Sequence, residues 1–254
     1  MKRIVVVSDT HCGHQYGLTP TKWNYRKTEK PGRQRKLMWD WYRKMIKSLQ
    51  PIDILVANGD LIDGTGKRSG GTELLTTDRI EQCEMALEVL GQANAKTYRF
   101  TFGTGYHTGD IEDFEKFIVS PLGGTIEAEQ PLEILGTRFL FRHHMNGGAS
   151  DQSALTAPFK FAIDDIQRSA RNKTKTAADI YVFSHRHRTY LGWLRGLMAV
   201  GTPCLQGESK YGVRRIGNHV DIGLVYFDVE EGITPWPNVE LLDAKHTKRV
   251  YEQL

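Results

Sequence analysis

The chain has few cysteines, and they show no paired spacing. Its 254 residues include three, Cys12, Cys83 and Cys204, an odd number without the close pairs that mark zinc fingers or disulfide frameworks. This disfavours a disulfide-stabilised secreted scaffold and a structural zinc domain, and favours a reducing compartment. At this length, a single domain can bury roughly 70 to 75% of its unfolded surface without crosslinks.

Long hydrophobic runs are also missing. The amino terminus has only four consecutive apolar residues, Ile4 to Val7, before Ser8, which is too short for a secretory signal peptide. No apolar stretch approaches the ~20 residues that cross a bilayer. We therefore expect a cytoplasmic protein with no membrane segment.

Charge of one sign does not dominate. The 34 basic and 30 acidic residues leave a net charge of +4, which is compatible with a polyanionic partner but too small to indicate one. The basic residues cluster in one segment, interleaved with Trp23 and Tyr25: Lys22, Arg26, Lys27, Lys30, Arg33, Arg35 and Lys36. The segment could hold nucleic acid through phosphate contacts and base stacking, or it could be a solvated loop that leads into a helix.

Apolar runs and periodicities predict an α/β fold. Strands are expected over residues 4–8, 52–57, 98–102, 138–142 and 180–183, and helices over residues 36–49, 73–95, 111–119 and 153–171. After residue 187 the chain is rich in strands, over 191–200 and 220–229. This order predicts one mixed sheet, or two packed sheets, with helices outside. We expect a single domain over residues 1–254, with a peripheral extension from about residue 237.

Five short blocks of acidic and imidazole residues follow the predicted strands. They are Asp9-Thr10-His11, Asn58-Gly59-Asp60, Gly103-Thr104-Gly105-Tyr106-His107, His143-His144 and His185-Arg186-His187. Open sheets bind ligands at the carboxyl ends of their strands, and carboxylates with imidazoles suit transition metals. Taken singly, the first block could cap a helix and the second could be a turn. Together, the blocks predict a metal-dependent hydrolase.

Spacing within the blocks favours particular ligands. Asp9 and His11 are two residues apart, as are His185 and His187, so both members of each pair can project to one side of an extended segment. His143 and His144 are adjacent and would face opposite ways on a strand. Only one of that pair is therefore expected to coordinate an ion.

In this order the blocks resemble the five-motif signature of the calcineurin-like metallophosphoesterases. The second block continues to a nearly complete match over Asn58-Gly59-Asp60-Leu61-Ile62-Asp63-Gly64, and the opening Ser8-Asp9-Thr10-His11-Cys12-Gly13-His14 is similar to phage and bacterial members. The resemblance spans about residues 4 to 190. It implies a four-layer sandwich of two mixed sheets flanked by helices, and a phosphoesterase with a dinuclear metal centre.

The resemblance also implies roles for individual residues. Asp9, His11 and His187 would hold one ion, and Asp60 would bridge to a second ion held by His185 and by His143 or His144. His144 is preferred, because the family ligand usually comes last before a loop that contains glycine or proline. Two divalent metal ions are expected, with manganese first and iron, zinc or nickel also compatible.

The third block departs from the family pattern. The family has Gly-Asn-His followed by an acid, whereas this chain has Gly105-Tyr106-His107-Thr108. Tyr106 therefore stands where the amide ligand belongs. Thr104 or water could replace that ligand, or His107 could coordinate. We predict that His107 is the catalytic imidazole.

The implied mechanism is attack on phosphorus by a metal-activated hydroxide, with His107 stabilising the developing charge or protonating the leaving oxygen. The favoured substrate is a phosphodiester in nucleic acid or a nucleotide. A phosphomonoesterase or protein phosphatase, and a metal-poor scaffold on the same fold, are the alternatives. Predicted substrate contacts are His14, Arg26, Lys27 and Arg186. The sequence indicates no protein partner.

Overall fold

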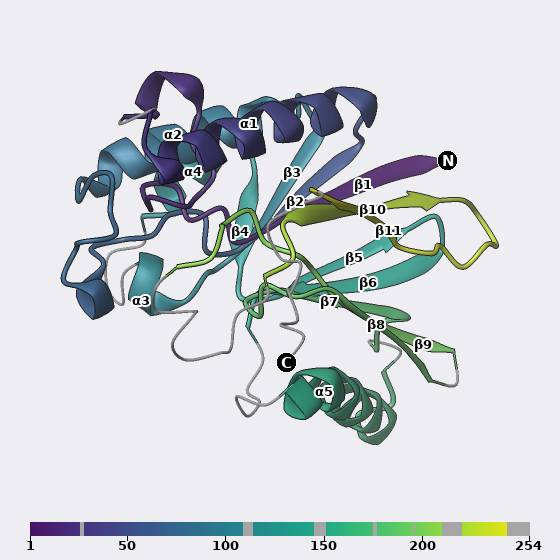
Figure 1. Cartoon of the computed structure of the whole chain (residues 1–254). Coiled ribbons are helices and arrows are strands. Elements are labelled where there is room, and N and C mark those ends of the chain that lie inside the picture. Colours follow the sequence, from purple (N-terminus) through teal and green to yellow (C-terminus); the bar gives the residue numbers. More distant parts are fainter. Residues whose placement is uncertain are drawn as a thin grey trace, which may run out of the picture.

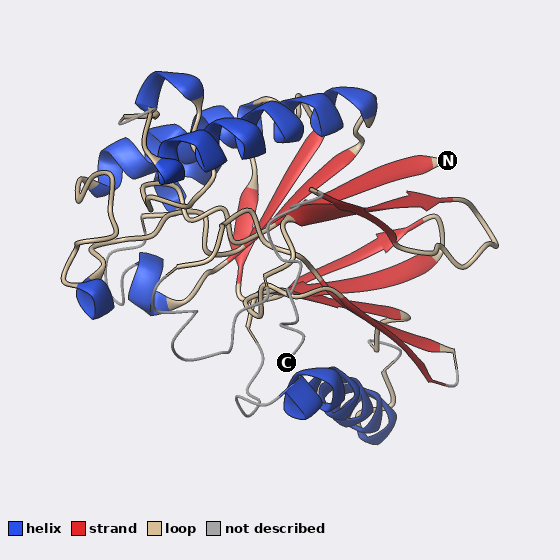
Figure 2. Cartoon of the chain, in the orientation of Figure 1, coloured by secondary structure: helices blue, strands red, loops and turns tan. Residues whose placement is uncertain are grey.

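Two mixed β-sheets pack face to face between outer layers of helices (Figures 1 and 2). The computed structural model describes residues 1–25, 28–108, 114–144, 151–174, 177–194, 196–209 and 220–242, without the side chains of Arg68 and of residues 151–155. The predicted architecture, two packed mixed sheets flanked by helices, is confirmed.

The six-stranded sheet carries the first three predicted strands. Its strand order is β11 (Asn238–Leu241), β10 (Gly223–Val229), β1 (Lys2–Val7), β2 (Ile54–Asn58), β3 (Thr97–Thr101) and β4 (Thr125–Glu127). Strands β1 to β4 run parallel, while β10 and β11 are antiparallel to their neighbours. The last four residues of both β1 and β2 are buried, which explains their unbroken apolar runs.

The five-stranded sheet has the order β5 (Gln130–Ile134), β6 (Thr137–Arg142), β7 (Ile180–Phe183), β9 (Leu197–Gly201) and β8 (Tyr190–Leu194). Strands β6, β7 and β9 are parallel, and β5 and β8 are antiparallel edge strands. The strand-rich stretch expected over residues 191–200 is thus a hairpin of β8 and β9.

Helices cover the outer face of each sheet. Helices α1 (Lys30–Ser48), α2 (Arg79–Gly91) and α4 (Lys116–Val119) lie on the six-stranded sheet, and α5 (Asp151–Arg171) lies on the five-stranded sheet (Figure 1). The other helices in the described part are short, as α4 is: α3 (Gly105–Thr108), η1 (Thr21–Trp23) and η2 (Lys67–Ser69). Within the described ranges, none of the helices combines the length and the hydropathy needed to span a bilayer.

The apolar core has three parts. Ile4, Val56, Phe141 and Phe227 are among the residues that fill the space between the two sheets. A second cluster lies between the six-stranded sheet and helices α1 and α2, and a third lies under α5. The carboxyl ends of β1, β2, β3, β6 and β7 lie at a common end of the molecule.

Several element boundaries differ from those expected. Helix α1 starts six residues earlier than predicted, at Lys30, because Pro31 fits its first turn. Helix α2 starts later, because the Asp78 carboxylate accepts hydrogen bonds from the backbone of Ile80 and Glu81 and caps it.

The sequence did not reveal β4, β5 and β11, which are short edge strands. The extension expected from about residue 237 begins as β11, and residues 243–254 lie outside the described part. Of the helix expected over residues 111–119, only Lys116–Val119 is helical in the described part.

Candidate metal centre

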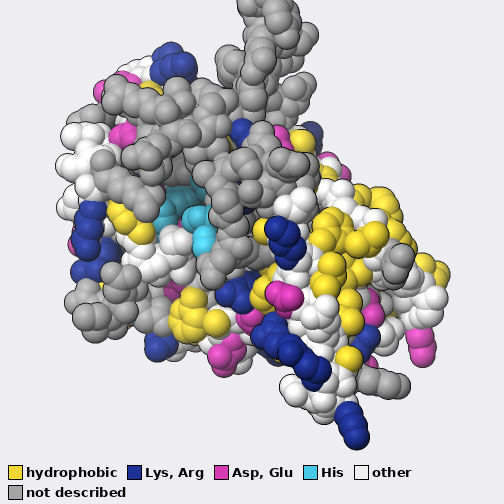
Figure 3. Space-filling model, turned by 90° about the horizontal axis from the view of Figure 1, so that it is seen from below, with side chains coloured by type: hydrophobic (Ala, Val, Ile, Leu, Met, Phe, Trp, Pro, Cys, Tyr) yellow, Lys and Arg dark blue, Asp and Glu magenta, His cyan; other side chains and the backbone are white. Residues whose placement is uncertain are grey.

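The five sequence blocks meet at the carboxyl ends of strands from both sheets. The residues come from the segments that follow β1, β2, β3, β6 and β7: Asp9, His11, Asp60, His107, His143, His185 and His187. Figure 3 shows histidine side chains gathered in a hollow on the face seen from below. The fold therefore gathers residues that are far apart in the chain.

Three overlapping sets of side chains could each hold a metal ion. The sets are Asp9, Asp60, His143 and His185; Asp9, His11 and His187; and His11, Asp60 and His107. Within each set the candidate ligand atoms all lie within 4.8 Å of one another. Asp9, His11 and Asp60 each belong to two sets, so neighbouring ion positions would share ligands.

The backbone is strained where these side chains emerge. Five of the eight non-glycine residues with positive φ in the described part are candidate ligands: Asp9, His11, Asp60, His185 and His187, with φ between 42° and 71°. Each left-handed non-glycine residue costs about 1 to 3 kcal/mol, and such strain concentrates at functional sites. The left-handed backbone conformation turns these side chains, at the ends of the strands, toward a common centre.

Two glycines make room for the ligands. A Cβ on Gly59 would come within 2.4 Å of the His143 ring, and one on Gly103 would come within 2.5 Å of Asp60. Gly59 also has a φ of 77°, a conformation that glycine adopts without strain. Gly59 in the second block and Gly103 in the third are therefore required because the His143 ring and Asp60 come so close to their backbones.

Outer partners fix the orientation of three imidazoles. The Nδ1 atoms of His11, His107 and His143 lie 3.0, 3.0 and 2.7 Å from the Asp63 carboxylate, the Asp63 carbonyl and the Asn58 carbonyl, respectively. Carbonyl and carboxylate oxygens only accept, so each Nδ1 carries the proton and donates. This leaves each Nε2 as the nitrogen free to bind an ion, an arrangement typical of metal-binding histidines.

The nitrogens and oxygens crowd together as a cation would require. The Nε2 atoms of His11 and His187 are 3.3 Å apart, and His187 Nε2 is 3.2 Å from Asp9 Oδ1. Asp9 Oδ1 is buried and, apart from this contact with His187, has no hydrogen-bond partner among the described residues. A buried carboxylate oxygen of this kind calls for a bound group, and the donor set fits a divalent cation.

Electrostatics keep the carboxylates charged. Burial alone would raise the pKa of Asp9, but the charges of His143 and His187 outweigh it and lower that pKa to about 2. The pKa of Asp60 likewise falls well below its usual value, mainly through His143. Burial lowers the pKa of His11 to about 4. At neutral pH Asp9 and Asp60 are therefore anionic and His11 is neutral, as metal ligands must be.

A buried polar network joins the two sheets beside the cluster. The hydroxyls of Ser8 and Thr202 lie 2.8 Å apart, and Thr202 donates to Ser184 over the same distance. Asn58 donates to the Ser184 hydroxyl at 2.6 Å and accepts from Thr101 at 2.8 Å. This network holds the ends of β1, β2, β3, β7 and β9 in register around the candidate ligands.

Comparison with solved structures shows which fold this is. The structure is similar to an archaeal phosphodiesterase, with a TM-score of 0.50, 12% identity, and coverage of 94% of this chain and 99% of that chain. The chain has the metallophosphoesterase fold. It is also similar to Vps29 from Chaetomium thermophilum, with a TM-score of 0.52, 11% identity, and coverage of 95% of this chain and 97% of that chain. A single-residue mutant of Vps29 from Entamoeba histolytica is similar as well, with a TM-score of 0.50, 9% identity, and coverage of 95% of this chain and 99% of that chain.

No protein-family model and no curated protein sequence matches the chain. At 9 to 12% identity, the similarity lies in the fold rather than in the sequence as a whole. The fold that the motif resemblance implied is thus confirmed. The phage or bacterial type stays a prediction.

Two acidic residues to which the sequence assigned no role support the candidate metal centre. Asp63 contacts both His11 and His107, as described above. In the sequence, the only sign of this role was that Asp63 belongs to the extended second block.

Glu115 is fully buried and accepts hydrogen bonds from the backbone of Leu61 at 3.3 Å and of Gly103 at 2.9 Å. Burial raises the pKa of Glu115 to about 8. Glu115 thus ties together the loops that carry Asp60 and His107, and no sequence signal marked it.

Replacing Asp63 with alanine is expected to weaken divalent-ion binding by about 10- to 100-fold, because His11 would lose the partner that orients it. Titration calorimetry with Mn²⁺ measures the change. Asp40→Ala, at an exposed carboxylate on α1, is the matched control and should bind as tightly as the parent protein. Equal affinities for Asp63→Ala and the parent would contradict the orienting role.

The structure separates the two histidines of the fourth block. His143 Nε2 lies 2.9 Å from Asp60 Oδ2, and His143 belongs to the first ligand set. His144, which the sequence favoured, is in none of the three sets; its ring packs against that of His185 with centroids 4.5 Å apart. Burial lowers the pKa of His144 to about 4. The geometry therefore favours His143 as the ligand.

The predicted substrate contacts fall in different places. His14 is only 4% exposed, and its Nδ1 accepts a hydrogen bond from the Tyr16 backbone at 3.1 Å, so it supports the first loop from inside. Arg186 is partly buried between His185 and His187 and lies beside the cluster. Arg26 and Lys27 lie outside the described residues.

The rest of the basic segment is largely engaged in structural contacts. Lys22 pairs with Glu88 at 3.0 Å and lies over the Trp23 ring. Arg35 is 1% exposed and donates to Asn24 at 3.0 Å, and Lys36 pairs with Asp40. These contacts favour the interpretation of the segment as a loop that leads into a helix.

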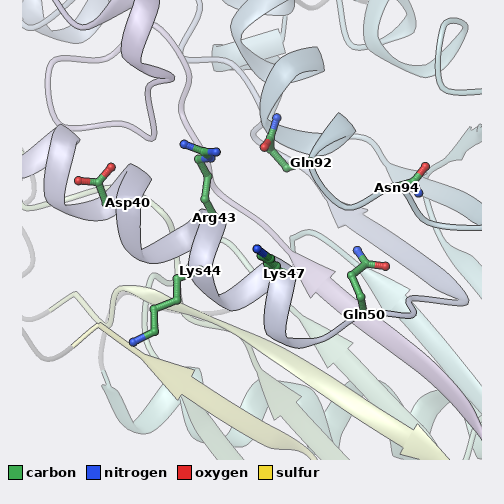
Figure 4. Close-up of a pocket in the computed structure, with 7 residues that line it drawn as sticks. All are labelled: Asp40, Arg43, Lys44, Lys47, Gln50, Gln92 and Asn94. Atoms are coloured by element: carbon green, nitrogen blue, oxygen red, sulfur yellow. The ribbon is translucent and has the colours of Figure 1, made fainter.

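A groove of about 610 Å³ lies away from the candidate metal centre (Figure 4). Its lining comes from α1 and from the segments that precede β2 and β3: Asp40, Arg43, Lys44, Lys47, Gln50, Gln92 and Asn94. The candidate ligands follow the carboxyl ends of these strands, so the groove lies at the opposite end of the six-stranded sheet and belongs to a separate surface.

Proposed function

We propose that the protein is a metal-dependent phosphoesterase that binds two divalent cations and hydrolyses a phosphodiester. The observation that carries this proposal is the gathering of buried carboxylates and imidazoles into overlapping sets whose ligand atoms lie within 4.8 Å. The fold, shared with an archaeal phosphodiesterase, supports the same reaction class.

We assign Asp9, His11 and His187 to one cation, and Asp60, His143 and His185 to the other. In this assignment Asp60 would bridge the two cations; it belongs to one set with His143 and His185 and to another with His11, and Asp9 likewise belongs to two sets. Manganese is the expected metal, and iron, zinc and nickel suit the same ligands. When bound, the cations supply Lewis acidity, which polarises phosphate oxygens and lowers the pKa of water.

Thr104 positions the bridging carboxylate. Its backbone N–H donates to Asp60 Oδ1 at 2.6 Å and its hydroxyl donates to the same oxygen at 2.9 Å. These bonds hold Asp60 in one orientation without the asparagine that the family has two residues further along. Thr104 therefore compensates for Tyr106 by fixing the carboxylate.

His107 is the residue that we assign to proton transfer. Its side chain is 17% exposed, and its Nδ1 donates to the Asp63 carbonyl, which leaves Nε2 available. Protonated at Nε2, the imidazole would donate to the leaving oxygen of the ester. Because His107 also forms a set with His11 and Asp60, coordination by His107 is the alternative role.

We propose a nucleic acid or a nucleotide as the source of the phosphodiester. The support lies in the sequence: Arg26 and Lys27 follow Tyr25, so this part of the basic segment combines positive charge with an aromatic ring. Arg186, beside the cluster, would contact the phosphate. A phosphomonoester or a phosphoprotein remains the alternative substrate on the same metal pair.

Mn²⁺-loaded protein is expected to hydrolyse a bis-aryl phosphate faster than a mono-aryl phosphate under the same conditions. Release of the aryl alcohol, followed by absorbance over a range of substrate concentrations, gives kcat/KM for both. Faster hydrolysis of the monoester would reverse the assigned substrate class. Absence of turnover with manganese, iron, zinc and nickel would overturn the enzyme assignment and favour a scaffold protein.

A further inference from the structure

We propose that the free edge of β8, with the apolar side chains beside it, is the interface through which two copies of this chain form a dimer. The surface, here named the edge patch, consists of Leu191 and Trp193 on β8, Trp236 in the β10–β11 loop, and Val239 and Leu241 on β11. In Figure 1 the tip of the β8–β9 hairpin and the β10–β11 loop lie on the same side of the molecule.

The edge patch continues the core between the sheets. Leu191 and Trp193 are paired with Val200 and Met198 of β9, and Val239 is paired with Val225 of β10. Directly paired residues of antiparallel strands share a face of the sheet, and all three partners belong to the core between the sheets. Among the described residues, the sandwich therefore opens at this side and leaves part of its inner apolar face uncovered.

The side chains of the edge patch are large and exposed. Trp193 and Trp236 are 50% and 56% exposed, and their rings stack with centroids 5.9 Å apart and an interplanar angle of 24°. The stacking joins the edge of one sheet to the loop of the other and holds both indoles in place. Rigid aromatic side chains with this exposure are typical of the central contacts of protein interfaces.

The sequence of β8 leaves its edge open to pairing. Exposed edges are normally protected by charged residues or proline, because their backbone N–H and C=O groups can bind another strand. Among the four edge strands in the described part, β4 contains Glu127, β5 contains Pro131 and Glu133, and β11 contains Glu240. Strand β8, Tyr190 to Leu194, has neither a charge nor a proline.

Both the area and the geometry suit a second copy. With roughly 100 Å² exposed on each tryptophan and less on each aliphatic residue, the edge patch presents on the order of 400 Å², which is in the range of the largest apolar patch on a typical monomer, a kind of patch that is often functional. Antiparallel pairing of two β8 strands about Gly192 would place Trp193 of each copy across from Leu191 of the other. A symmetric contact would bury this area on both copies, together with the backbone edge of each β8 strand. The total buried area then approaches the ~1,200 Å² of a small stable interface.

The edge patch contains none of the candidate metal ligands. Strand β8 starts three residues after His187 and runs away from it toward the β8–β9 turn, and Trp193 lies near that turn. The inference therefore does not depend on the proposed function, and a variant of the edge patch leaves the candidate ligands intact.

Sedimentation velocity of the full chain over micromolar to hundred-micromolar concentrations tests the proposal. The parent protein is expected to sediment with twice the mass of a single chain, and Trp193→Glu is expected to shift the species to monomer, with at least a 100-fold weaker dissociation constant. Phe117→Glu is the matched control, because Phe117 is a 58% exposed aromatic on α4, outside the edge patch. It should remain dimeric.

Leu191→Lys is a second variant that tests the same surface in case Trp193→Glu misfolds. Far-UV circular dichroism checks that both variants retain the fold. A parent protein that is monomeric at every concentration overturns the proposal. So does a dimer that persists in both folded variants of β8, since its contact would then lie elsewhere.

Discussion

Phosphodiester hydrolysis by the Asp60→Asn variant is expected to be at least about a thousand-fold slower than that of the parent protein. Asp60 Oδ2 lies 2.9 Å from His143 Nε2 and 3.7 Å from His185 Nδ1, and Asp60 belongs to two of the three ligand sets. The substitution keeps the shape but removes the negative charge that two cations would share. Loss of several kcal/mol of electrostatic stabilisation gives this magnitude.

Asp53→Asn is the matched control for this substitution. Asp53 lies just before β2, at the opposite end from Asp60, and binds Lys96 and the Arg3 backbone. Its replacement should leave turnover and metal content unchanged, whereas Asp60→Asn should lose bound metal in elemental analysis. Parent-like turnover together with full metal content in Asp60→Asn would contradict the proposed centre.

The stability of the metal-free protein is expected to fall as the pH rises from 6.5 to above 9, and His143 should contribute about 3 kcal/mol of that fall. Burial alone would lower the pKa of His143, but Asp60 and Asp9 raise it from 6.5 to about 9. The folded state then holds the proton more tightly than the unfolded state. The stabilisation is complete below pH 6.5 and is lost as the pH passes 9.

Urea unfolding in the presence of a chelator, at several pH values between 6 and 10, measures this dependence. The raised pKa values of Glu115 and His187 act in the same direction, so the informative comparison is with His143→Gln, whose stability should fall by about 3 kcal/mol less. Identical slopes for the two proteins would show that His143 does not hold an additional proton in the folded state.

Bound metal should reverse the advantage of low pH. Metal ligands must be deprotonated, so ion binding competes with the proton on His143 and releases it. The same cluster that stabilises the metal-free protein through an ion pair is therefore expected to stabilise the metal-bound protein best at neutral pH and above.

Much of the fold could be predicted because its central strands are buried on both faces. The unbroken apolar runs that became β1, β2 and β7 stand out in the sequence. The meeting of the polar blocks could be predicted as well, since parallel strands place their carboxyl ends, and the residues that follow them, at one edge of the sheet. Strands β4, β5 and β11 escaped because short edge strands, exposed on one side, have no comparable pattern.

The candidate site was predicted in its residue types but not in its geometry. His143 and His144 are adjacent residues of the same type, so the sequence does not distinguish them. The turn after β6 decides which of them reaches Asp60. The role of Glu115 depends on backbone groups of Leu61 and Gly103, which lie far away in the chain. Contacts of this kind leave no local trace.

The amino-acid order alone therefore determined the alternation of buried strands and helices and the five places where metal-binding side chains could occur, because hydrophobic periodicity and residue chemistry are local properties. Only the tertiary structure decided which imidazoles face the carboxylates, which backbone angles turn them inward, and which edge strand stays open. Those features depend on packing between segments that are distant in the chain, where small differences in strand-end geometry redirect a whole side chain.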